Sequence, residues 1–251
     1  MAKEIQTKEQ RTKAERSRRE RMLEVYRNSP IPDDETLGNL GLFIPKTEMS
    51  RLLYIGELYQ RILDVHGVIM EFGVRWGHNM AIFEAFRGIH EPFNWIRKIV
   101  GFDTFEGFRA VSKKDGDAEI IEEGSFGVTE NYQDYLEQLL ALREAEGVQL
   151  DMKRFELVKG DASETVPKYL EDHPETIISL AYFDFDIYQP TRDCLEAIRG
   201  HLTKGSVVAF DELNHHDFPG ETIALKEVFG LDRYKLIHSP FSSARAYFVH
   251  D

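Results

Sequence analysis

The sequence of 251 residues has little cysteine, no long apolar run and no excess of positive charge. Its one cysteine, Cys194, excludes an internal disulfide framework and a cysteine-based zinc site. The helix-like pattern around Cys194 predicts a small buried hydrophobic residue. No run approaches the roughly 18 to 20 apolar residues of a membrane span, and no basic region followed by an apolar one marks a secretory signal. These absences favour a soluble protein of the reducing cytoplasm.

The net charge of −13 disfavours a general nucleic-acid binder, because phosphate contacts need clustered Lys and Arg. The charge is uneven, since residues 1–25 carry eight Lys or Arg against five Glu. Such a segment could bind RNA or anionic lipid, but it lacks interleaved aromatic residues and a strong apolar face. It is more typical of a solvated helix that packs on a partner subunit. We therefore expect a charged helical arm and linker over residues 1–45, no nucleic-acid or membrane partner, and a homodimer.

The rest of the chain, residues 46–251, alternates short apolar runs with helical patterns, which is typical of βαβ units and a mostly parallel sheet. Thr47 fits the N-cap of the first helix. The expected strands span residues 67–73, 99–103, 155–160, 178–184, 206–212, 234–239 and 244–250. The last two runs are joined by "PFSS", which predicts an antiparallel pair. The pattern therefore predicts one α/β domain with a doubly wound, Rossmann-like sheet of seven strands.

One connection, over about residues 104–130, is too long for an ordinary loop. Structureless segments of this length are usually functional or disordered. We expect this segment to form a lid over a ligand.

The first expected strand ends in "MEFGVRWGHN", which places Glu71, Gly73 and Gly77 in an E-x-G-x-x-x-G pattern. Ligands of open parallel sheets collect at the carboxyl ends of the strands. The pattern differs from the dinucleotide fingerprint, and a carboxylate beside the turn would repel a pyrophosphate. It favours a ligand with an amino group and no phosphate, such as S-adenosylmethionine.

The next two strand ends also carry acids. Asp103 in "VGFDTFEGF" is placed to accept hydrogen bonds from both ribose hydroxyls. Asp161 in "VKGDASETVP" could accept one from an adenine amino group. Taken singly, each acid could equally be a helix cap or a loop carboxylate. Three acids at consecutive strand ends together favour a nucleoside ligand.

Further acids follow the fourth and fifth strands. Asp184, in "YFDFDIYQPT", ends the fourth strand, and Asp211 and Glu212, in "VVAFDELN", end the fifth. Parallel neighbours would bring these three carboxylates to one edge, where they would repel one another. A hard cation such as Mg²⁺ would neutralise them. Alternatively, Asp184 or Asp186 caps the following helix.

A general base is harder to choose from the sequence. His215 and His216 lie just beyond the expected metal ligands Asp211 and Glu212. A histidine near its reference pKa could take a hydroxyl proton. Two adjacent loop histidines are also often only solvent-facing. Asp186 could serve as the base or support the metal ligands.

The segments "VIMEFGVRWG", "VGFDTFEGF", "YFDFDIYQPT" and "VVAFDELN" resemble those of class I S-adenosylmethionine-dependent methyltransferases, and more narrowly of the macrocin-type sugar O-methyltransferases. The resemblance covers roughly residues 67–250. It implies a magnesium-dependent methyl transfer to a sugar hydroxyl, with Asp184, Asp211 and Glu212 as metal ligands. The cofactor residues that it implies are Glu71, Gly73, Arg75, Gly77, Asp103, Thr104, Asp161, Ala162 and Asp184.

Two positions depart from the family pattern, which tends to have glycine where this chain has Phe185 and aspartate where it has Glu212. The favoured acceptor is the 3-hydroxyl of a dTDP-linked 6-deoxyhexose. Its diphosphate could meet Arg75, Arg109, Lys113 and Lys114, although the two lysines also fit a plain surface charge run. Alternative functions are methylation of a catechol-like or macrolide-attached diol, a non-catalytic binding module, and an NAD-dependent oxidoreductase, which the missing third glycine disfavours.

Overall fold

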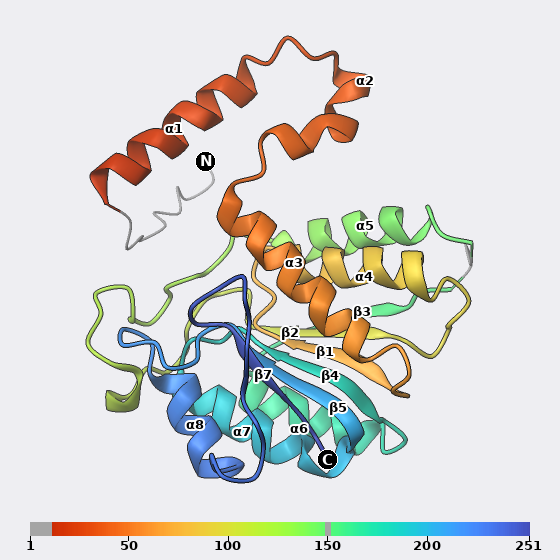
Figure 1. Ribbon diagram of the computed structural model, residues 1–251, viewed down its shortest axis with the longest axis vertical. Helices are drawn as coiled ribbons and strands as arrows, with labels where there is room; N and C mark the ends of the chain where they lie inside the picture. Colours follow the sequence, from red (N-terminus) through yellow and green to blue (C-terminus); the bar gives the residue numbers. More distant parts are fainter. Residues whose placement is uncertain (1–11, 149–151) are drawn as a thin grey trace.

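The computed structural model describes residues 12–148 and 152–251, and its seven strands form one sheet in the order β3-β2-β1-β4-β5-β7-β6 (Figure 1). Strands β1 to β5 are parallel, and β7 runs antiparallel to both β5 and β6. The strands are β1 (Val68–Phe72), β2 (Ile99–Asp103), β3 (Phe155–Lys159), β4 (Ile178–Phe183), β5 (Leu202–Phe210), β6 (Ile237–His238) and β7 (Ala246–Val249). The predicted doubly wound, seven-stranded sheet with an antiparallel last pair is confirmed.

Helices cover both faces of this sheet (Figure 1). On one face, α3, α4 and α5 bury a core that includes Leu58, Phe83 and Leu136. On the other, α6, α7 and α8 bury a second core, which holds the predicted buried Cys194. The helices are α3 (Lys46–Arg61), α4 (His78–His90), α5 (Tyr132–Glu144), α6 (Ala162–Asp172), α7 (Tyr188–Ile198), the 3₁₀ turn η3 (Arg199–His201) and α8 (Gly220–Val228).

Several predicted boundaries were wrong: β6 begins at Ile237 rather than at residue 234, β5 ends at Phe210 rather than at residue 212, and two starts differ for a clear physical reason. The first helix of the domain begins at Lys46 with Pro45 as its N-cap, so Thr47 lies inside the helix instead of capping it. Strand β5 begins at Leu202 rather than at residue 206, because a register shift against β4 admits extra residues and Gly205 takes a φ of 93° there. Glycine takes this backbone conformation at little cost, so a strand continues through a sequence that resembles a turn.

The arm consists of α1 (Lys13–Arg27), α2 (Asp33–Thr36) and the 3₁₀ turn η1 (Leu37–Leu42), and it stands away from the sheet (Figure 1). Thr12 and Glu15 form a capping box at the start of α1. No residue of these three elements is buried. Residues 1–11 of the predicted arm lie outside the described residues.

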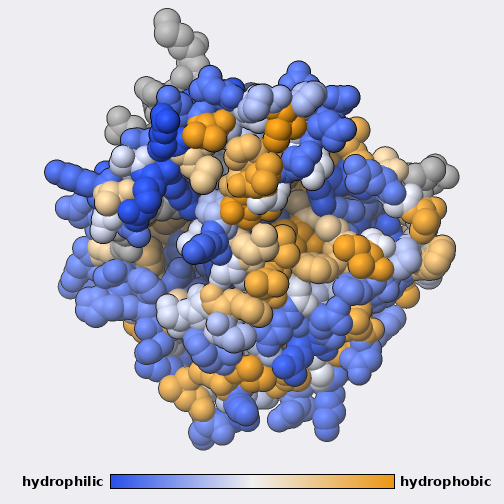
Figure 2. All heavy atoms as spheres, turned by 45° about the horizontal axis from the view of Figure 1, so that its top comes forward, coloured by the Kyte–Doolittle hydropathy of each residue, from blue (hydrophilic) through white to orange (hydrophobic). Residues whose placement is uncertain are grey.

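Apolar side chains of the arm are exposed, among them Met22, Leu23, Val25 and Tyr26. The face that Figure 2 turns forward carries several groups of hydrophobic side chains between hydrophilic ones. Across the described parts of the chain, no helix is long and apolar enough to cross a membrane.

The long segment after β2 is fixed near its middle by the 3₁₀ turn η2 (Lys113–Asp115). The buried Asp115 accepts hydrogen bonds from the backbone N–H groups of Tyr188 and Ser112. Lys114 pairs with Glu227 of α8, with Nζ and Oε1 2.7 Å apart. The segment is therefore held to α7 and α8, beside the carboxyl edge of the sheet.

Candidate active site

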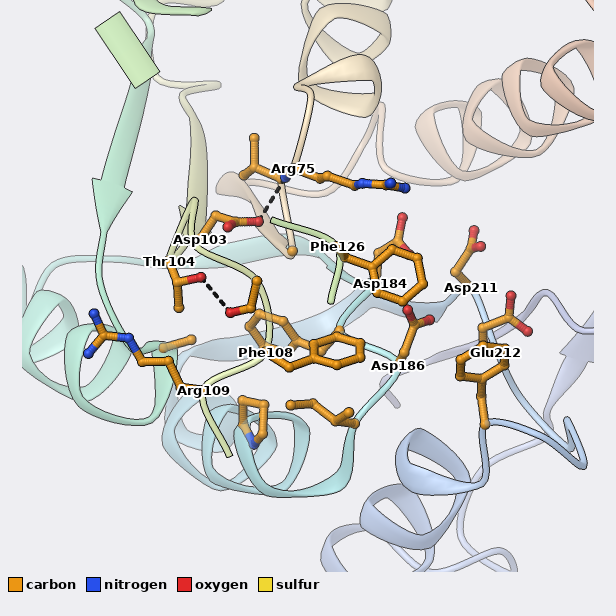
Figure 3. A pocket seen from close by; sticks show the side chains of 18 of the residues that line it. Arg75, Asp103, Thr104, Phe108, Arg109, Phe126, Asp184, Asp186, Asp211 and Glu212 are labelled. Carbon is orange, nitrogen blue, oxygen red and sulfur yellow. Dashed lines mark hydrogen bonds between the residues drawn. The ribbon is translucent and has the colours of Figure 1, made fainter. Parts of the chain in front are cut away.

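A pocket of about 680 Å³ lies at the carboxyl edge of the sheet, between the strand ends, the segment after β2 and the start of α3 (Figure 3). The predicted site residues that line it are Gly73, Arg75, Asp103, Thr104, Asp161, Ala162, Asp184, Asp186, Asp211 and Glu212. Four others, Glu71, Gly77, His215 and His216, are absent from its lining. Phe108, Arg109 and Phe126 of the predicted lid form part of its wall.

The turn after β1 brings two strand ends into close contact. Gly73 has a φ of 97°, and a Cβ there would lie 2.1 Å from the backbone oxygen of Asp184. Only glycine fits this approach. Glu71, inside β1, is fully buried, and its burial and then the charge of Asp184 raise its pKa well above the usual range. A cationic ligand group beside Glu71 would reverse this shift.

Gly77 serves the fold. It is the N-cap of α4 with a φ of 76°, and a Cβ at this position would lie 2.3 Å from a methyl carbon of Leu136. The glycine therefore lets α5 pack against the start of α4. The structure gives Gly77 this packing role and does not place it in the pocket.

The carboxylate of Asp103 is held by backbone N–H groups from two loops, the one after β1 and the one after β2. Its Oδ2 accepts a hydrogen bond of 2.7 Å from the Arg75 backbone N–H, and its Oδ1 one of 2.6 Å from that of Phe105 (Figure 3). Burial raises its pKa. The backbone N–H of Val74 also acts on this carboxylate, whose two oxygens together have about four lone pairs, so a ribose diol can still donate to it. Thr104 donates from Oγ1 to the Gly107 oxygen at 2.8 Å and so braces the start of the lid.

Asp161 caps α6, because its Oδ1 accepts a 3.0 Å hydrogen bond from the Ser163 backbone N–H. The capping alternative for this acid is thus confirmed. The cap uses Oδ1 only, and both Asp161 and the next residue, Ala162, line the pocket. Its contact with adenine stays a prediction.

The parallel register brings the acids of β4 and β5 together. The Asp184 backbone N–H donates to the Phe72 oxygen at 2.8 Å, and that of Asp211 donates to the Phe183 oxygen at 3.0 Å. Both carboxylates therefore emerge at neighbouring strand ends, beside Asp186 and Glu212 (Figure 3). Burial and the charge of Asp211 raise the pKa of Asp184.

Arginines that the sequence reasoning missed compensate these acids. Arg51 of α3 bridges two of them, with Nη1 3.1 Å from Asp184 Oδ2 and Nη2 3.3 Å from Asp211 Oδ2. Arg245 donates from Nε to Asp211 Oδ1 at 2.6 Å, and the Tyr182 hydroxyl donates to the same oxygen at 2.6 Å. Although burial opposes the effect, Arg51 and Arg245 lower the pKa of Asp211.

The predicted metal site is not formed in this arrangement. The described residues contain no group of three or more His, Cys, Asp or Glu side chains placed to hold a metal ion. The physical reason is Arg51, whose guanidinium spans Asp184 and Asp211. The donor chemistry still suits a hard cation, because Glu212 Oε2 is buried and accepts no hydrogen bond within the described residues. Burial and Asp211 raise the pKa of Glu212 to about 8.

Glu221 is a further acid that the sequence reasoning missed. It is buried in the first turn of α8, and its Oε1 accepts from the backbone N–H groups of Phe185 and Asp186 at 3.1 and 3.3 Å. Its Oε2 accepts from the Glu212 backbone N–H at 3.2 Å. Glu221 therefore joins the turn after β4 to the end of β5, and Asp186 in that turn adopts a φ of 62°.

The two histidines point in different directions. His215 has Nε2 3.9 Å from Glu212 Oε2 and accepts a 3.3 Å hydrogen bond at Nδ1 from the Asp217 backbone N–H. The side chain of His216 is fully exposed beside Asp217. His215 thus supports an acid of the site, while the structure does not bring His216 to the pocket.

Comparison with solved structures finds two crystal structures of CalS11. One, a calicheamicin methyltransferase, is 43% identical, has a TM-score of 0.93 and covers 98% of both chains. The other, the apo form of a TDP-rhamnose 3'-O-methyltransferase of calicheamicin biosynthesis, is 44% identical, has a TM-score of 0.83 and covers 96% of both chains. The O-methyltransferase NovP shares the fold at 19% identity, with a TM-score of 0.58 over 80% of this chain and 79% of its own.

No protein-family model and no curated protein matches the chain. Identity above 40% to CalS11 along nearly the whole length nevertheless decides the family. Membership sets aside the oxidoreductase alternative. The chain belongs to the class I S-adenosylmethionine-dependent methyltransferases and, within them, to the sugar O-methyltransferases that include CalS11.

Proposed function

We propose that this enzyme methylates the 3-hydroxyl of a dTDP-linked 6-deoxyhexose. The observation that carries the proposal is the similarity to CalS11, a TDP-rhamnose 3'-O-methyltransferase, over 96–98% of the chain. The pocket supports it by combining the acids of β4 and β5 with four arginines in its wall, of which Arg51 pairs with those acids and the others are Arg19, Arg75 and Arg109. Guanidinium groups suit phosphate oxygens.

The cofactor would lie across the ends of β1, β2 and β3. Glu71 and the turn at Gly73 would hold the amino acid portion, Asp103 the ribose, and Asp161 with Ala162 the adenine. Arg75 and Thr104 would shape the wall between these positions. This placement aims the sulfonium methyl group at the neighbouring end of β4, where Asp184 lies.

The acceptor would lie between the lid and the acids. Arg75 is the best placed diphosphate ligand, because its guanidinium lies 4.8 Å from the ring centre of Phe126 and faces the pocket. Arg109 also lines the pocket but pairs with Glu106 at 3.1 Å. Lys114 is held by Glu227 outside the pocket lining, so we assign it to anchoring the lid.

We assign Asp184, Asp211 and Glu212 to a Mg²⁺ ion that replaces the Arg51 bridge. Such an ion would lower the pKa of the sugar hydroxyl and help to position its oxygen for attack on the methyl group. In the transfer, the bond from sulfur to the methyl carbon breaks as the bond from oxygen to that carbon forms. The hydroxyl proton goes to the carboxylate of Asp186, which lines the pocket two residues after Asp184.

Labelled S-adenosylmethionine tests the function directly. The purified enzyme is offered dTDP-6-deoxyhexoses, glycosylated natural products and catechols, each with Mg²⁺ and with chelator. We expect Mg²⁺-dependent label on the 3-hydroxyl of a dTDP-sugar. Asp184→Asn should lower turnover by about 100-fold or more, whereas Asp172→Asn, on the exposed side of α6, should not. Label only on a catechol or an attached sugar, or full turnover in chelator, would contradict the proposal.

We also propose a homodimer in which the arm packs on the partner subunit. The support is the exposed apolar surface of α1, which the described residues of the same chain leave uncovered. Light scattering should show a dimer for the wild-type protein and a monomer for Leu23→Glu. A monomeric wild type would contradict this proposal.

A further inference from the structure

Arg51 holds the place between the two acids that a divalent cation would need. Its two terminal nitrogens contact Oδ2 of Asp184 and Oδ2 of Asp211 at 3.1 and 3.3 Å. Asn79 adds only a 3.4 Å hydrogen bond to Asp184 Oδ2. One guanidinium therefore spans the two oxygens that the resemblance assigns to the metal.

The bridge is the replaceable part of this cluster. Asp211 is anchored through its other oxygen, Oδ1, by Arg245 Nε and the Tyr182 hydroxyl, both at 2.6 Å, and Arg245 Nη2 also donates to its Oδ2, at 3.4 Å. The two short bonds keep the carboxylate oriented when Arg51 leaves. The contacts of Arg51 are longer, and a small cation binds carboxylate oxygens more closely, at roughly 2.0 to 2.1 Å for Mg²⁺.

Charge also favours the exchange. Asp186 and Glu212 line the same pocket as the bridged pair, and the buried Glu221 accepts hydrogen bonds from the backbone N–H groups of both. Arg51 supplies one positive charge at the Asp184–Asp211 pair, where a divalent cation would supply two, and Arg245 stays on Asp211 in either case. The cation would also give the buried Glu212 Oε2 a partner.

The displaced side chain has a place to go. Glu48 precedes Arg51 by one turn of α3 and lines the same pocket. Side chains three residues apart on a helix are neighbours. Glu48 lies 3.7 Å from Arg19 and 3.6 Å from His78, whose pKa is lowered by burial, and its charge already acts on Arg51.

We propose that Arg51 competes with the divalent cation for Asp184 and Asp211. In the cation-free enzyme Arg51 holds the two carboxylates together and keeps the fold intact. When the cation binds, Arg51 swings to Glu48 and opens the acceptor side of the pocket. The inference rests on the proposed carboxylate metal site, but it concerns a residue that this site does not include.

Mn²⁺ binding, followed by electron paramagnetic resonance without substrate, tests the competition. Arg51→Met removes the charge at similar length and should bind Mn²⁺ about tenfold more tightly than the wild type. Arg61→Met, in the last turn of the same helix, should leave the affinity unchanged. Glu48→Gln removes the alternative partner and should weaken binding. Affinity in Arg51→Met equal to or below that of the wild type would overturn the proposal.

Thermal unfolding gives a second readout that needs no turnover. In chelator, Arg51→Met should melt below the wild type, because Asp184 and Asp211 lose their shared counter-charge. Excess Mn²⁺ should remove most of that difference. A difference that Mn²⁺ leaves unchanged would mean that Arg51 is a fixed structural residue. Absence of methyl transfer with these Mn²⁺ results intact would refute the proposed function alone.

Discussion

The two edges of the sheet treat buried charge in opposite ways. At the amino edge, Arg97 is 2% exposed and nearly surrounded by acceptors. It donates to both carboxylate oxygens of Glu91, at 2.9 and 3.1 Å, to the Gly67 oxygen at 2.7 Å and to the Ser179 hydroxyl at 2.6 Å. These contacts join the starts of β1, β2 and β4, so the charge at this edge serves the fold.

At the carboxyl edge, acids outnumber their cationic partners. Asp211 is well paired, but burial and neighbouring acids raise the pKa values of Asp184, Asp186 and Glu221. Such a cluster lowers the stability of the protein. Clusters of this kind are typical of functional sites, where a bound ligand offsets the repulsion. The difference teaches that a cluster of buried charges with a counter-charge for each acid serves the fold, whereas a cluster with more acids than counter-charges suits a ligand.

The largest expected effect is at the amino edge. Arg97→Met should lower the free energy of unfolding by about 3 to 5 kcal/mol, because it removes a buried guanidinium and leaves the partly buried Glu91 and several backbone acceptors without their donor. The folded fraction should keep its turnover. Denaturant titration and specific activity measure the two quantities. Arg61→Met, half exposed, is the matched control and should cost about 0 to 1 kcal/mol. A large loss of turnover in folded Arg97→Met would mean that the amino edge also contributes to catalysis, which contradicts the proposed difference between the two edges.

Asp186→Asn should show the reverse pattern at the carboxyl edge. Without a proton acceptor, turnover should fall by about 100-fold to 10,000-fold, while stability is unchanged or higher because one underpaired acid is removed. His215→Gln should lose less, since it acts through Glu212, and the exposed His216→Gln should be near wild type. Steady-state rates and melting temperatures distinguish these cases. A rate in His215→Gln lower than that in Asp186→Asn would move the base to the histidine.

The backbone of the carboxyl edge is as demanding as its charges. Gly73→Ala should cost about 1 to 3 kcal/mol through its positive φ, with more from the contact with Asp184, and should abolish S-adenosylmethionine binding. Denaturant titration measures the loss of stability, and titration calorimetry measures the binding of S-adenosylmethionine. Gly88→Ala is the matched control: this glycine lies in α4 with open space around it, so alanine should stabilise the protein by about 0.5 to 1 kcal/mol. If Gly73→Ala bound S-adenosylmethionine normally, the turn at Gly73 would not be part of the cofactor site.

The sheet and the acids were predictable from the sequence because their signals are local. An apolar run that ends in an acid marks a strand and its carboxyl end, and parallel topology then brings Asp184 and Asp211 together. The turn glycine, Gly73, follows from the same pattern. Strand and helix starts at Leu202 and Lys46 were missed because a bulge and a proline cap hide them.

The partners of the acids were not predictable, because tertiary packing alone brings them there. Arg51 lies 133 residues before Asp184 and reaches it only because α3 crosses the end of the sheet. Arg245 had one visible signal, a lone cation at the start of an apolar strand. The neighbours His215 and His216 diverge because no periodicity fixes the direction of side chains in a loop.

The smallest expected effect distinguishes the two edges by pH. Although burial works the other way, hydrogen bonds from Arg97 and Tyr59 lower the pKa of Glu91 from its ordinary value of 4.5. A depressed folded-state pKa stabilises the protein above the unfolded value and ceases to do so as pH falls through the folded value. The melting-temperature gap between wild type and Glu91→Gln should therefore be constant near neutral pH and shrink below about 4.5.

The exposed Glu175→Gln should show no such gap at any pH. A gap for Glu91→Gln that widened on acidification would mean that Glu91 is protonated in the folded protein. The amino edge would then resemble the carboxyl edge, where burial and like charge raise the pKa values of the acids. A gap that closes on acidification would instead show that the fold keeps its ionised, fully paired carboxylate at one edge and leaves the underpaired ones at the other for a ligand.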